Sequence, residues 1–486
     1  YETDGGDTMN WGAIKDIAQA VNSGKTSAAE NVERSLRLID EKNDDFKAII
    51  AVVRDRALER AQDIDEKVKN GEKVGRLAGV PFVAKDNFLT FGSETTAASN
   101  ILKGFNAPYQ ATAIEKLEAE GAICVAKANL DAFAHGSSTE NSDFFTTLNP
   151  HDKSLVPGGS SGGSAAAVVL GVAPFALGSD TGGSIRLPAS FTGCVGLKPT
   201  YGLVSRSGVV AMASSLDCIG PITNSVEDAA LVLDVMSGCD PLDSTTIESD
   251  PNGYAVDGSD QNMKGLRVGV VKEYMGKGLD DDVRESVEKA VEKLKAAGAV
   301  ISEVSLPSLP LALAVYYIVC PAEVSSNLSR YDGQRYGYSD KSASSLDESY
   351  EKSREKGFGD EAKRRIMIGT YVLSSGYYDA YYKKAQTVRT MLIDEFNQAL
   401  KSVDLLVGPT APTTAFRIGE NTADPLKMYL ADILTVAANL TGVPSISIPA
   451  YPSKKNKMPI GLQVIAGQGK DRELLEFAKT AEGALE

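Results

Sequence analysis

Residues 158–189 read GGSSGGSAAAVVLGVAPFALGSDTGGSIRLPA, a stretch that holds two serine clusters embedded in glycine. Ser160 and Ser184 lie 24 positions apart. Glycine beside a serine lets backbone N–H groups approach a substrate closely and permits turns that other residues resist. Residues 165–170, AAAVVL, have the composition of a buried helix, whereas a flexible linker would be polar. The stretch therefore predicts a glycine-lined serine site that leads directly into the protein core.

A candidate base lies upstream, at Lys85 in the apolar run VPFVAKDN of residues 80–87. A lysine behind an apolar strand can lose its proton on desolvation and act as a base. The chain has two histidines, so a Ser-His-Asp enzyme would need His135 or His151 as its base. His151 lies in a turn-like NPHD run, where a loop role is expected, and His135 fits a supporting role near the site. The residues favour a serine nucleophile activated without histidine.

Two familiar motifs match the glycine-rich segment only in part. Residues 158–162 fit G-x-S-x-G, but that motif needs a preceding strand and a downstream acid and histidine. Here Val156 and Pro157 precede it, and no histidine follows residue 151. The segment also lacks the Gly-Lys-Ser/Thr ending of a phosphate-binding loop. We therefore reject both a nucleophile elbow and a nucleotide site.

Composition narrows the functional classes. The 486 residues carry a net charge of −15 and 43% hydrophobic residues, enough for a sizeable core. A basic footprint is missing, so the chain alone is a poor candidate for binding nucleic acid. The five scattered cysteines include no C-x-x-C, which favours buried free thiols in a reducing compartment. The apolar run at residues 165–178 is too short to span a bilayer, and we expect no membrane association.

The first residues read as a tail. Residues 1–9 are acidic and polar, and Met9 is the expected natural start, with a remnant of expression before it. We expect residues 1–9 to be disordered or to come from expression. A processed organellar protein is the alternative.

Helix and strand patterns alternate along the rest of the chain. Residues 10–70 read mainly as helices, with a capping box at Ser27 and Glu30. Strands are predicted at residues 77–83, 122–127, 266–271, 300–306, 405–408, 445–450 and 461–466, and helices at 113–120, 283–298, 311–402 and 471–486. This alternation predicts an α/β fold with a sheet covered on both faces. Strands on both sides of a polar loop at 240–261 favour one domain over residues 10–486, with a helical insertion around 311–402.

Residues 158–164 and 178–186 together resemble the signature of the amidase signature family. Blocks at residues 325–333, 374–382 and 424–429 are similar to the members of this family that serve as A subunits of glutamyl-tRNA(Gln) amidotransferases. The resemblance runs from about residue 10 to the end of the chain. It implies an α/β/α fold around a large mixed central sheet flanked by helices.

The resemblance also implies a Ser–cis-Ser–Lys triad. In this chain the triad falls on Ser184 as nucleophile, Ser160 as proton relay after a cis peptide bond, and Lys85 as the neutral base. Backbone N–H groups of the following turn would bind the oxyanion, namely those of Thr181, Gly182, Gly183 and Ser184. We expect Asp180 and Arg186 to brace this turn as a buried ion pair.

Substrate and partners follow from the same resemblance. Arg365 and Asp432 are expected to bind the α-carboxylate and α-ammonium of glutamine, with Tyr316 nearby. The chain needs no cofactor of its own, and ATP and Mg²⁺ are expected at a partner B subunit that activates Glu-tRNA(Gln). A small C subunit completes a heterotrimer. The expected compartment is the cytoplasm, or alternatively an organellar matrix. His135 and Ala132 depart from the methionine and glutamate common at these positions.

Two other functions remain open on the sequence. A stand-alone amidase of the same fold would act on a small amide, and Arg365 and Asp432 argue against it because its pocket would be more apolar. A catalytically idle scaffold within an assembly is the other. The intact Lys85, Ser160 and Ser184 argue against that class.

Overall fold

A computed structural model describes residues 11–256, 263–422 and 424–486. The tail predicted at residues 1–9 lies outside these described residues. An 11-stranded sheet runs through the described part of the chain. Its strands, in spatial order, are β1 (Ile49–Val52), β3 (Ile123–Ala128), β2 (Pro81–Lys85), β4 (Phe175–Asp180), β6 (Cys218–Thr223), β5 (Val195–Lys198), β10 (Ser445–Pro449), β11 (Gly461–Ile465), β9 (Leu405–Pro409), β7 (Arg267–Val271) and β8 (Val300–Val304).

The sheet is mixed. Strand β2 runs parallel to β3 and β4, and β7 runs parallel to β8 and β9, while the remaining pairs are antiparallel. This confirms the predicted α/β fold with a large mixed sheet. Because strands from both halves of the chain join in one continuous sheet, where β5 pairs with β10, we propose that residues 10–486 form one domain.

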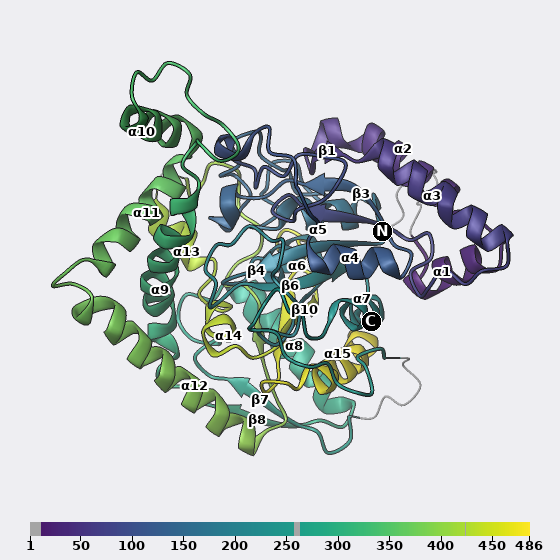
Figure 1. Cartoon of the computed structure of the whole chain (residues 1–486). Helices are drawn as coiled ribbons and strands as arrows, with labels where there is room; N and C mark the ends of the chain where they lie inside the picture. The colour runs from purple at the N-terminus through teal and green to yellow at the C-terminus, as the bar shows by residue number, and fades with distance from the viewer. Residues whose placement is uncertain (1–10, 257–262, 423) are drawn as a thin grey trace.

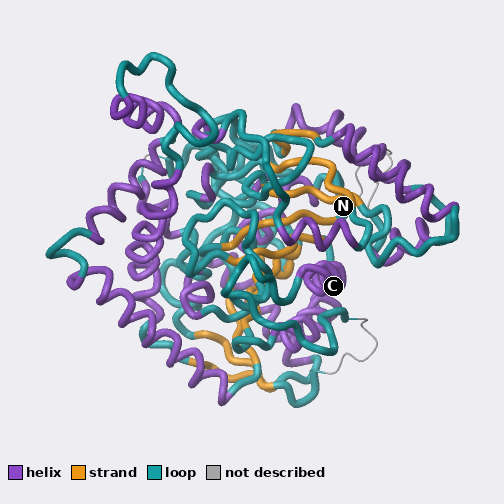
Figure 2. The backbone as a smooth tube through the Cα atoms, viewed as in Figure 1, coloured by secondary structure: helices purple, strands orange, loops and turns teal. Residues whose placement is uncertain are grey.

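Helices lie around the sheet, which occupies the centre of the molecule (Figure 1; Figure 2). The α-helices are α1 (Ile14–Asn22), α2 (Ala28–Phe46), α3 (Arg54–Lys69), α4 (Thr112–Ala119), α5 (Gly162–Val169), α6 (Arg186–Thr192), α7 (Val226–Met236), α8 (Asp281–Ala296), α9 (Ala312–Asn327), α10 (Leu346–Gly357), α11 (Asp360–Leu373), α12 (Lys384–Ser402), α13 (Pro425–Leu430), α14 (Val436–Thr441) and α15 (Asp471–Leu485). The helices α9, α11 and α12 gather on one side and α1–α3 on the other (Figure 1).

At β9, two different hydrophobic clusters bury the two faces of the sheet. Along β9, Leu405 and Val407 belong to a cluster that includes residues of α1, α2, α7 and α15. The intervening Leu406 belongs to a second cluster with residues of α9, α12 and α14. Successive side chains of a strand point to opposite faces, so this alternation shows a sheet covered on both sides.

The N-terminal region differs from the prediction in two places. The capping box is confirmed, because Ser27 Oγ accepts from the Glu30 N–H and the Glu30 side chain accepts from the Ser27 N–H. However, residues 49–52 form β1 at the sheet edge, in a region that was predicted to be mainly helical. The strand predicted at residues 77–83 begins at Pro81 and includes Lys85, since residues 77–80 form a turn that precedes the parallel ladder.

The predicted helical region at 311–402 comprises α9 to α12, interrupted by a non-helical segment at residues 331–345. The stretch Leu309–Arg330, which overlaps this region, is long and apolar enough by composition to cross a membrane, and half of its apolar 18-residue window is buried inside the protein. Buried core helices meet the same criterion of length and composition. Helix α9 packs against α11, α12 and α14, as a core helix does.

Candidate active site

Lys85 lies at the end of β2, a strand flanked on both sides by the parallel strands β3 and β4. Its side chain is fully buried. The Nζ donates to the Oγ atoms of Ser160 at 2.7 Å, Ser161 at 2.9 Å and Ser179 at 3.1 Å. The structure therefore brings the predicted lysine and the first predicted serine into direct contact.

The environment of Lys85 favours its neutral form. Burial lowers the pKa of Lys85 from 10.5 to about 7, although the negative charges of Asp131, Asp180 and Asp217 act in the opposite direction. Its hydrogen-bond partners among the described residues are serine hydroxyls and the Ser179 carbonyl, which carry no charge. An uncharged amine 2.7 Å from a serine hydroxyl can accept a proton from it.

Ser160 follows a cis peptide bond with Gly159, as the family resemblance implies. The Asp131 carboxylate lies against this bond, and a Cβ on Gly159 would come within 2.2 Å of Asp131 Oδ2. The same carboxylate accepts from the N–H groups of Thr139 at 2.9 Å and Asn141 at 3.0 Å. Only glycine fits at position 159, and Asp131 connects the Ser160 segment to the loop at residues 136–141.

Ser184 lies in the turn between β4 and α6. It is 7% exposed, whereas Ser160 and Lys85 are fully buried. Its carbonyl accepts from the Ser161 N–H at 3.1 Å, which joins the two serine clusters of the sequence. A nucleophile must reach the substrate while its base stays desolvated, and this difference in exposure suits those two roles.

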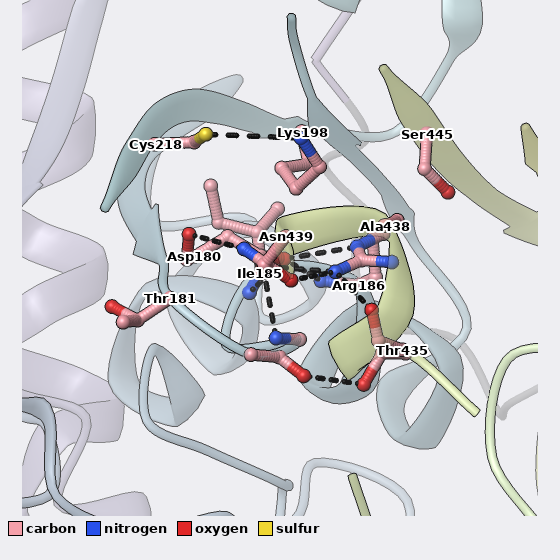
Figure 3. A network of polar contacts seen from close by, with 12 residues as sticks. Asp180, Thr181, Ile185, Arg186, Lys198, Cys218, Thr435, Ala438, Asn439 and Ser445 are labelled. Atoms are coloured by element: carbon pink, nitrogen blue, oxygen red, sulfur yellow. Dashed lines mark hydrogen bonds and ion pairs between the residues drawn. The ribbon is translucent and has the colours of Figure 1, made fainter. Parts of the chain in front are cut away.

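A buried network holds the turn before Ser184 (Figure 3). Arg186 Nε donates to Asp180 Oδ2 at 3.1 Å, and Arg186 Nη2 donates to Asp180 Oδ1 at 3.0 Å. Both side chains are fully buried. Although burial raises the pKa of Asp180, the charge and hydrogen bonds of Arg186 hold it at about 2. The predicted brace is therefore present as an ion pair. Removing one partner would leave a buried charge, at a cost of about 3–5 kcal/mol.

The remaining partners of Arg186 come from the far end of the sequence. Its Nη groups donate to Asn439 Oδ1 at 2.7 Å and the Thr435 carbonyl at 3.1 Å (Figure 3). They also donate to Gln463 Oε1 at 2.6 Å. No sequence pattern pointed to these three residues, because an isolated asparagine, glutamine or threonine in an apolar region carries no motif.

One of the N–H groups predicted to bind the oxyanion already has a partner. The Gly183 N–H donates to Asp180 Oδ1 at 2.8 Å, so it is already committed to the brace. The N–H groups of Thr181, Gly182 and Ser184 have no acceptor among the residues that the structure describes. The Gly182 carbonyl accepts from Thr435 Oγ1 at 2.6 Å, which fixes the peptide plane. Donors held in this way by the fold can stabilise a developing oxyanion without reorganisation.

Tyr316 lies against this turn. A Cβ placed on Gly182 would come within 2.7–2.9 Å of the Tyr316 ring and hydroxyl. Tyr316 is 3% exposed, and its ring contacts Tyr317 edge to face at 5.0 Å between centroids. The structure thus places Tyr316 between the oxyanion turn and the pocket around Arg365.

Arg365 projects from α11 and is 2% exposed. Its Nε donates to Glu361 Oε1 at 2.8 Å. The guanidinium carbon lies 5.4 Å from the Tyr317 ring centroid and 5.6 Å from that of Tyr429, and these two rings stack at 3.9 Å. A cavity of about 60 Å³ opens beside Arg365 and is lined by Ser137 and Tyr429 among others. Tyr317, Tyr429 and Ser137 were not predicted as site residues.

Asp432 is connected to the oxyanion turn by Thr435. Its carbonyl accepts from the Thr435 N–H at 3.0 Å, and the Thr435 hydroxyl binds the Gly182 carbonyl. Asp432 Oδ2 accepts from Ser137 Oγ at 2.7 Å, whereas the buried Oδ1 has no partner among the described residues. Burial raises the pKa of Asp432 to about 7, although the charge of Arg365 lowers it. A buried carboxylate oxygen without a donor is costly and fits a cationic ligand.

A second cavity approaches the lysine from another direction. It measures about 200 Å³, and its lining includes Ser179, which contacts Lys85, and Asn87, whose buried Oδ1 has no partner in the described part of the chain. It extends to Arg206 and Leu242, the latter 75% exposed. Within the described residues, no group of three or more His, Cys, Asp or Glu side chains is arranged to hold a metal ion.

Comparison with known proteins places this geometry among amide-cleaving enzymes. The amidase family model matches residues 30–475. A protein from Koribacter versatilis, named as the A subunit of glutamyl-tRNA(Gln) amidotransferase, is 51% identical over 466 residues, 96% of this chain and 97% of its own length. A protein of the same name from Staphylococcus aureus is 48% identical and covers 97% of this chain and 96% of itself.

Solved structures agree. The crystal structure of the glutamyl-tRNA(Gln) amidotransferase A subunit from Thermotoga maritima superposes with a TM-score of 0.77 at 41% identity, covering 93% of this chain and 91% of that one. A bacterial aryl acylamidase of the amidase signature enzymes superposes with a TM-score of 0.85 at 25% identity, covering 98% and 96%. The same fold therefore serves both an amidotransferase component and an acylamidase.

Proposed function

The chain belongs to the amidase family, and on this premise we propose that it is the subunit of a tRNA-dependent amidotransferase that hydrolyses glutamine and supplies ammonia. The choice of glutamine rests on the presence of two buried groups in one region of the described chain: the Arg365 guanidinium and the Asp432 carboxylate, whose Oδ1 has no partner there. A guanidinium binds a carboxylate in a bidentate fork, and a carboxylate binds an ammonium. The two groups together fit the head of a free α-amino acid.

The chemistry follows from the lysine–serine contacts. Ser184 Oγ attacks the side-chain amide carbon of glutamine, and its proton passes through Ser160 to neutral Lys85. The N–H groups of Thr181, Gly182 and Ser184 donate to the oxyanion. When the C–N bond breaks, the proton returns through Ser160 to the leaving nitrogen, which departs as ammonia. Water then attacks the ester on Ser184 by the same proton route, and glutamate leaves.

The partners follow from this role. A B subunit binds ATP and Mg²⁺, activates Glu-tRNA(Gln) and accepts the ammonia, and a small C subunit lies between the two chains. The net charge of −15 suits a chain that leaves tRNA binding to its partner. The proposed compartment is one that holds tRNA, namely the cytoplasm or an organellar matrix.

We expect Arg365→Ala to impair the reaction with glutamine as the nitrogen source but not the reaction with ammonium. In the assembled complex, the kcat/KM for glutamine in forming Gln-tRNA(Gln) should fall by roughly 10²–10⁴-fold, because two charge-assisted hydrogen bonds to the α-carboxylate are lost. The rate with an ammonium salt should stay within about twofold of the wild type, since free ammonia bypasses this site. The surface variant Arg54→Ala, whose arginine pairs with Asp40 away from the site, is the matched control.

This experiment also tests the proposed function. A wild-type complex that forms no Gln-tRNA(Gln) from glutamine, or an isolated chain that prefers unrelated amides at full rate, would identify a stand-alone amidase instead. Equal losses with glutamine and ammonium in Arg365→Ala would mean that Arg365 serves the interface between subunits or the fold.

The pH dependence of glutamine hydrolysis should report the lysine base. The reactive form of Lys85 is neutral, and this form predominates above its pKa of about 7. The kcat should therefore fall about tenfold per pH unit as the pH drops below about 7. The KM should rise over the same range, because Asp432, with a pKa of about 7, loses the negative charge that attracts the ammonium. Glutamate release measured from pH 5.5 to 9 checks both trends, and a level kcat below pH 7 would contradict a lysine base.

A further inference from the structure

His135 is a buried histidine with no hydrogen-bond partner for its ring among the described residues. Its side chain is fully buried, and neither Nδ1 nor Nε2 meets a donor or acceptor there. Buried polar atoms are almost always paired, so an imidazole with two vacant nitrogens calls for an explanation. The histidine holds a fixed backbone position, because Asn141 Nδ2 donates to its carbonyl at 2.8 Å.

In the sequence, His135 adjoins the pocket proposed for the amino-acid head. The two residues that follow it, Gly136 and Ser137, line the cavity beside Arg365. The ring of Phe133 lies 6.2 Å from the His135 ring between centroids. Burial lowers the pKa of His135 and the positive charge of Arg365 lowers it further, so the imidazole is neutral. A neutral imidazole offers one N–H donor and one acceptor.

Other polar atoms without a partner in the described chain gather in the same region. Ser138 Oγ follows the serine that binds Asp432, and Tyr317 OH belongs to a ring over which Arg365 lies. Asp432 Oδ1 is also among them. The imidazole and the two hydroxyls can donate to an anion, while the Asp432 carboxylate can accept from a cation. A zwitterionic ligand with an adjacent carboxylate and ammonium offers both kinds of partner.

We propose that His135 is a substrate-binding residue whose imidazole N–H donates to the α-carboxylate held by Arg365 and adds to the binding of amides with a free α-carboxylate. This inference rests on the proposed function, since glutamine supplies that carboxylate. The choice of the carboxylate rests on Arg365, which lines the same cavity as Gly136 and Ser137 and can hold an anion to which a neutral imidazole can also donate.

The first test compares two substrates in the assembled complex, glutamine and 4-aminobutanamide, which keeps the amide and the amine but lacks the carboxylate. His135→Met has a similar size and no N–H donor. We expect it to raise the KM for glutamine about tenfold or more, to leave kcat within about threefold, and to leave 4-aminobutanamide hydrolysis unchanged. His135→Asn and His135→Gln place an amide N–H near the Nδ1 and Nε2 positions, and one of them should recover most of the glutamine KM.

The outcomes separate this inference from the proposed function. A wild-type complex that uses both amides equally would refute the glutamine assignment. A wild type that prefers glutamine, with His135→Met unchanged or with equal losses on both substrates, would refute the role of His135 alone. The latter result, accompanied by a lower melting temperature, would make His135 a packing residue.

A second measurement avoids variants at position 135. The chain has two histidines, so ¹⁵N-histidine labelling of this chain alone gives two imidazole signal sets. His151→Gln assigns them. Glutamine added to the complex carrying Ser184→Ala, which cannot turn it over, should shift the His135 nitrogens and leave those of His151 in place. His135 signals that stay fixed at saturating glutamine would overturn the inference.

Discussion

Ser184→Ala is expected to lower the kcat of glutamine hydrolysis by on the order of 10⁴–10⁶-fold. Without the hydroxyl no acyl-enzyme can form, because Ser160 lies buried against Lys85 and serves as the relay. Glutamate release by the complex measures the loss. Amidation with an ammonium salt should be retained, which would show that the complex still assembles. The melting temperature should stay close to that of the wild type, since Ser184 contributes its carbonyl to the fold, and alanine keeps it.

A trapping experiment can contradict this assignment directly. An electrophilic glutamine analogue should form its covalent adduct on the peptide that contains Ser184, and mass spectrometry identifies the modified residue. An adduct on Ser160, Ser161 or another residue would refute the role of Ser184.

The second large effect is expected at the base. Lys85→Ala should reduce kcat nearly as much as Ser184→Ala, by on the order of 10³–10⁶-fold, because the proton of Ser184 has no acceptor. Lys85→Arg should be no better, since a guanidinium stays protonated at every working pH. The double variant Lys85→Ala with Ser184→Ala should be little worse than either single one, because the residues act as a unit.

Losses that multiply in the double variant would show that Lys85 and Ser184 act independently. A Lys85→Arg enzyme with substantial activity would show that position 85 provides only a positive charge. Each variant needs a thermal denaturation measurement, since Lys85→Ala also leaves three buried serine hydroxyls without their common partner.

The sequence predicts those site residues that belong to short, contiguous motifs. Ser160, Ser184 and Lys85 stand in short motifs of glycine or apolar residues, and the structure brings the first serine to the lysine as expected. Asp180 and Arg186 are six positions apart, so their pairing was also accessible. In contrast, the support that Arg186 receives from Gln463 joins residues 277 positions apart. No local pattern specifies such a contact, because it depends on the order of strands in the sheet.

Local ambiguity explains the errors in the fold. Residues 77–83 form a continuous apolar run, which fixes neither the first residue of a buried strand nor its register. The short segment at 49–52 lies between two long helices and becomes a strand by pairing with β3. The oxyanion turn shows a different limit. Its glycines indicated free N–H groups. The hydrogen bond from the Gly183 N–H to Asp180 depends on the orientation of the Asp180 side chain, which the sequence does not specify.

The long reach of the Arg186 contacts sets the time at which activity can arise during synthesis. The ribosome makes β4 and the serine clusters early, but β10 and β11, which flank the site, and the side chain of Gln463 come near the end. At about 5–20 residues per second, a ribosome needs on the order of tens of seconds to bridge 277 positions. A nascent chain halted in that interval holds every member of the Lys85–Ser160–Ser184 set yet lacks the framework that orients it. Truncated products of translation should therefore be unable to waste cellular glutamine.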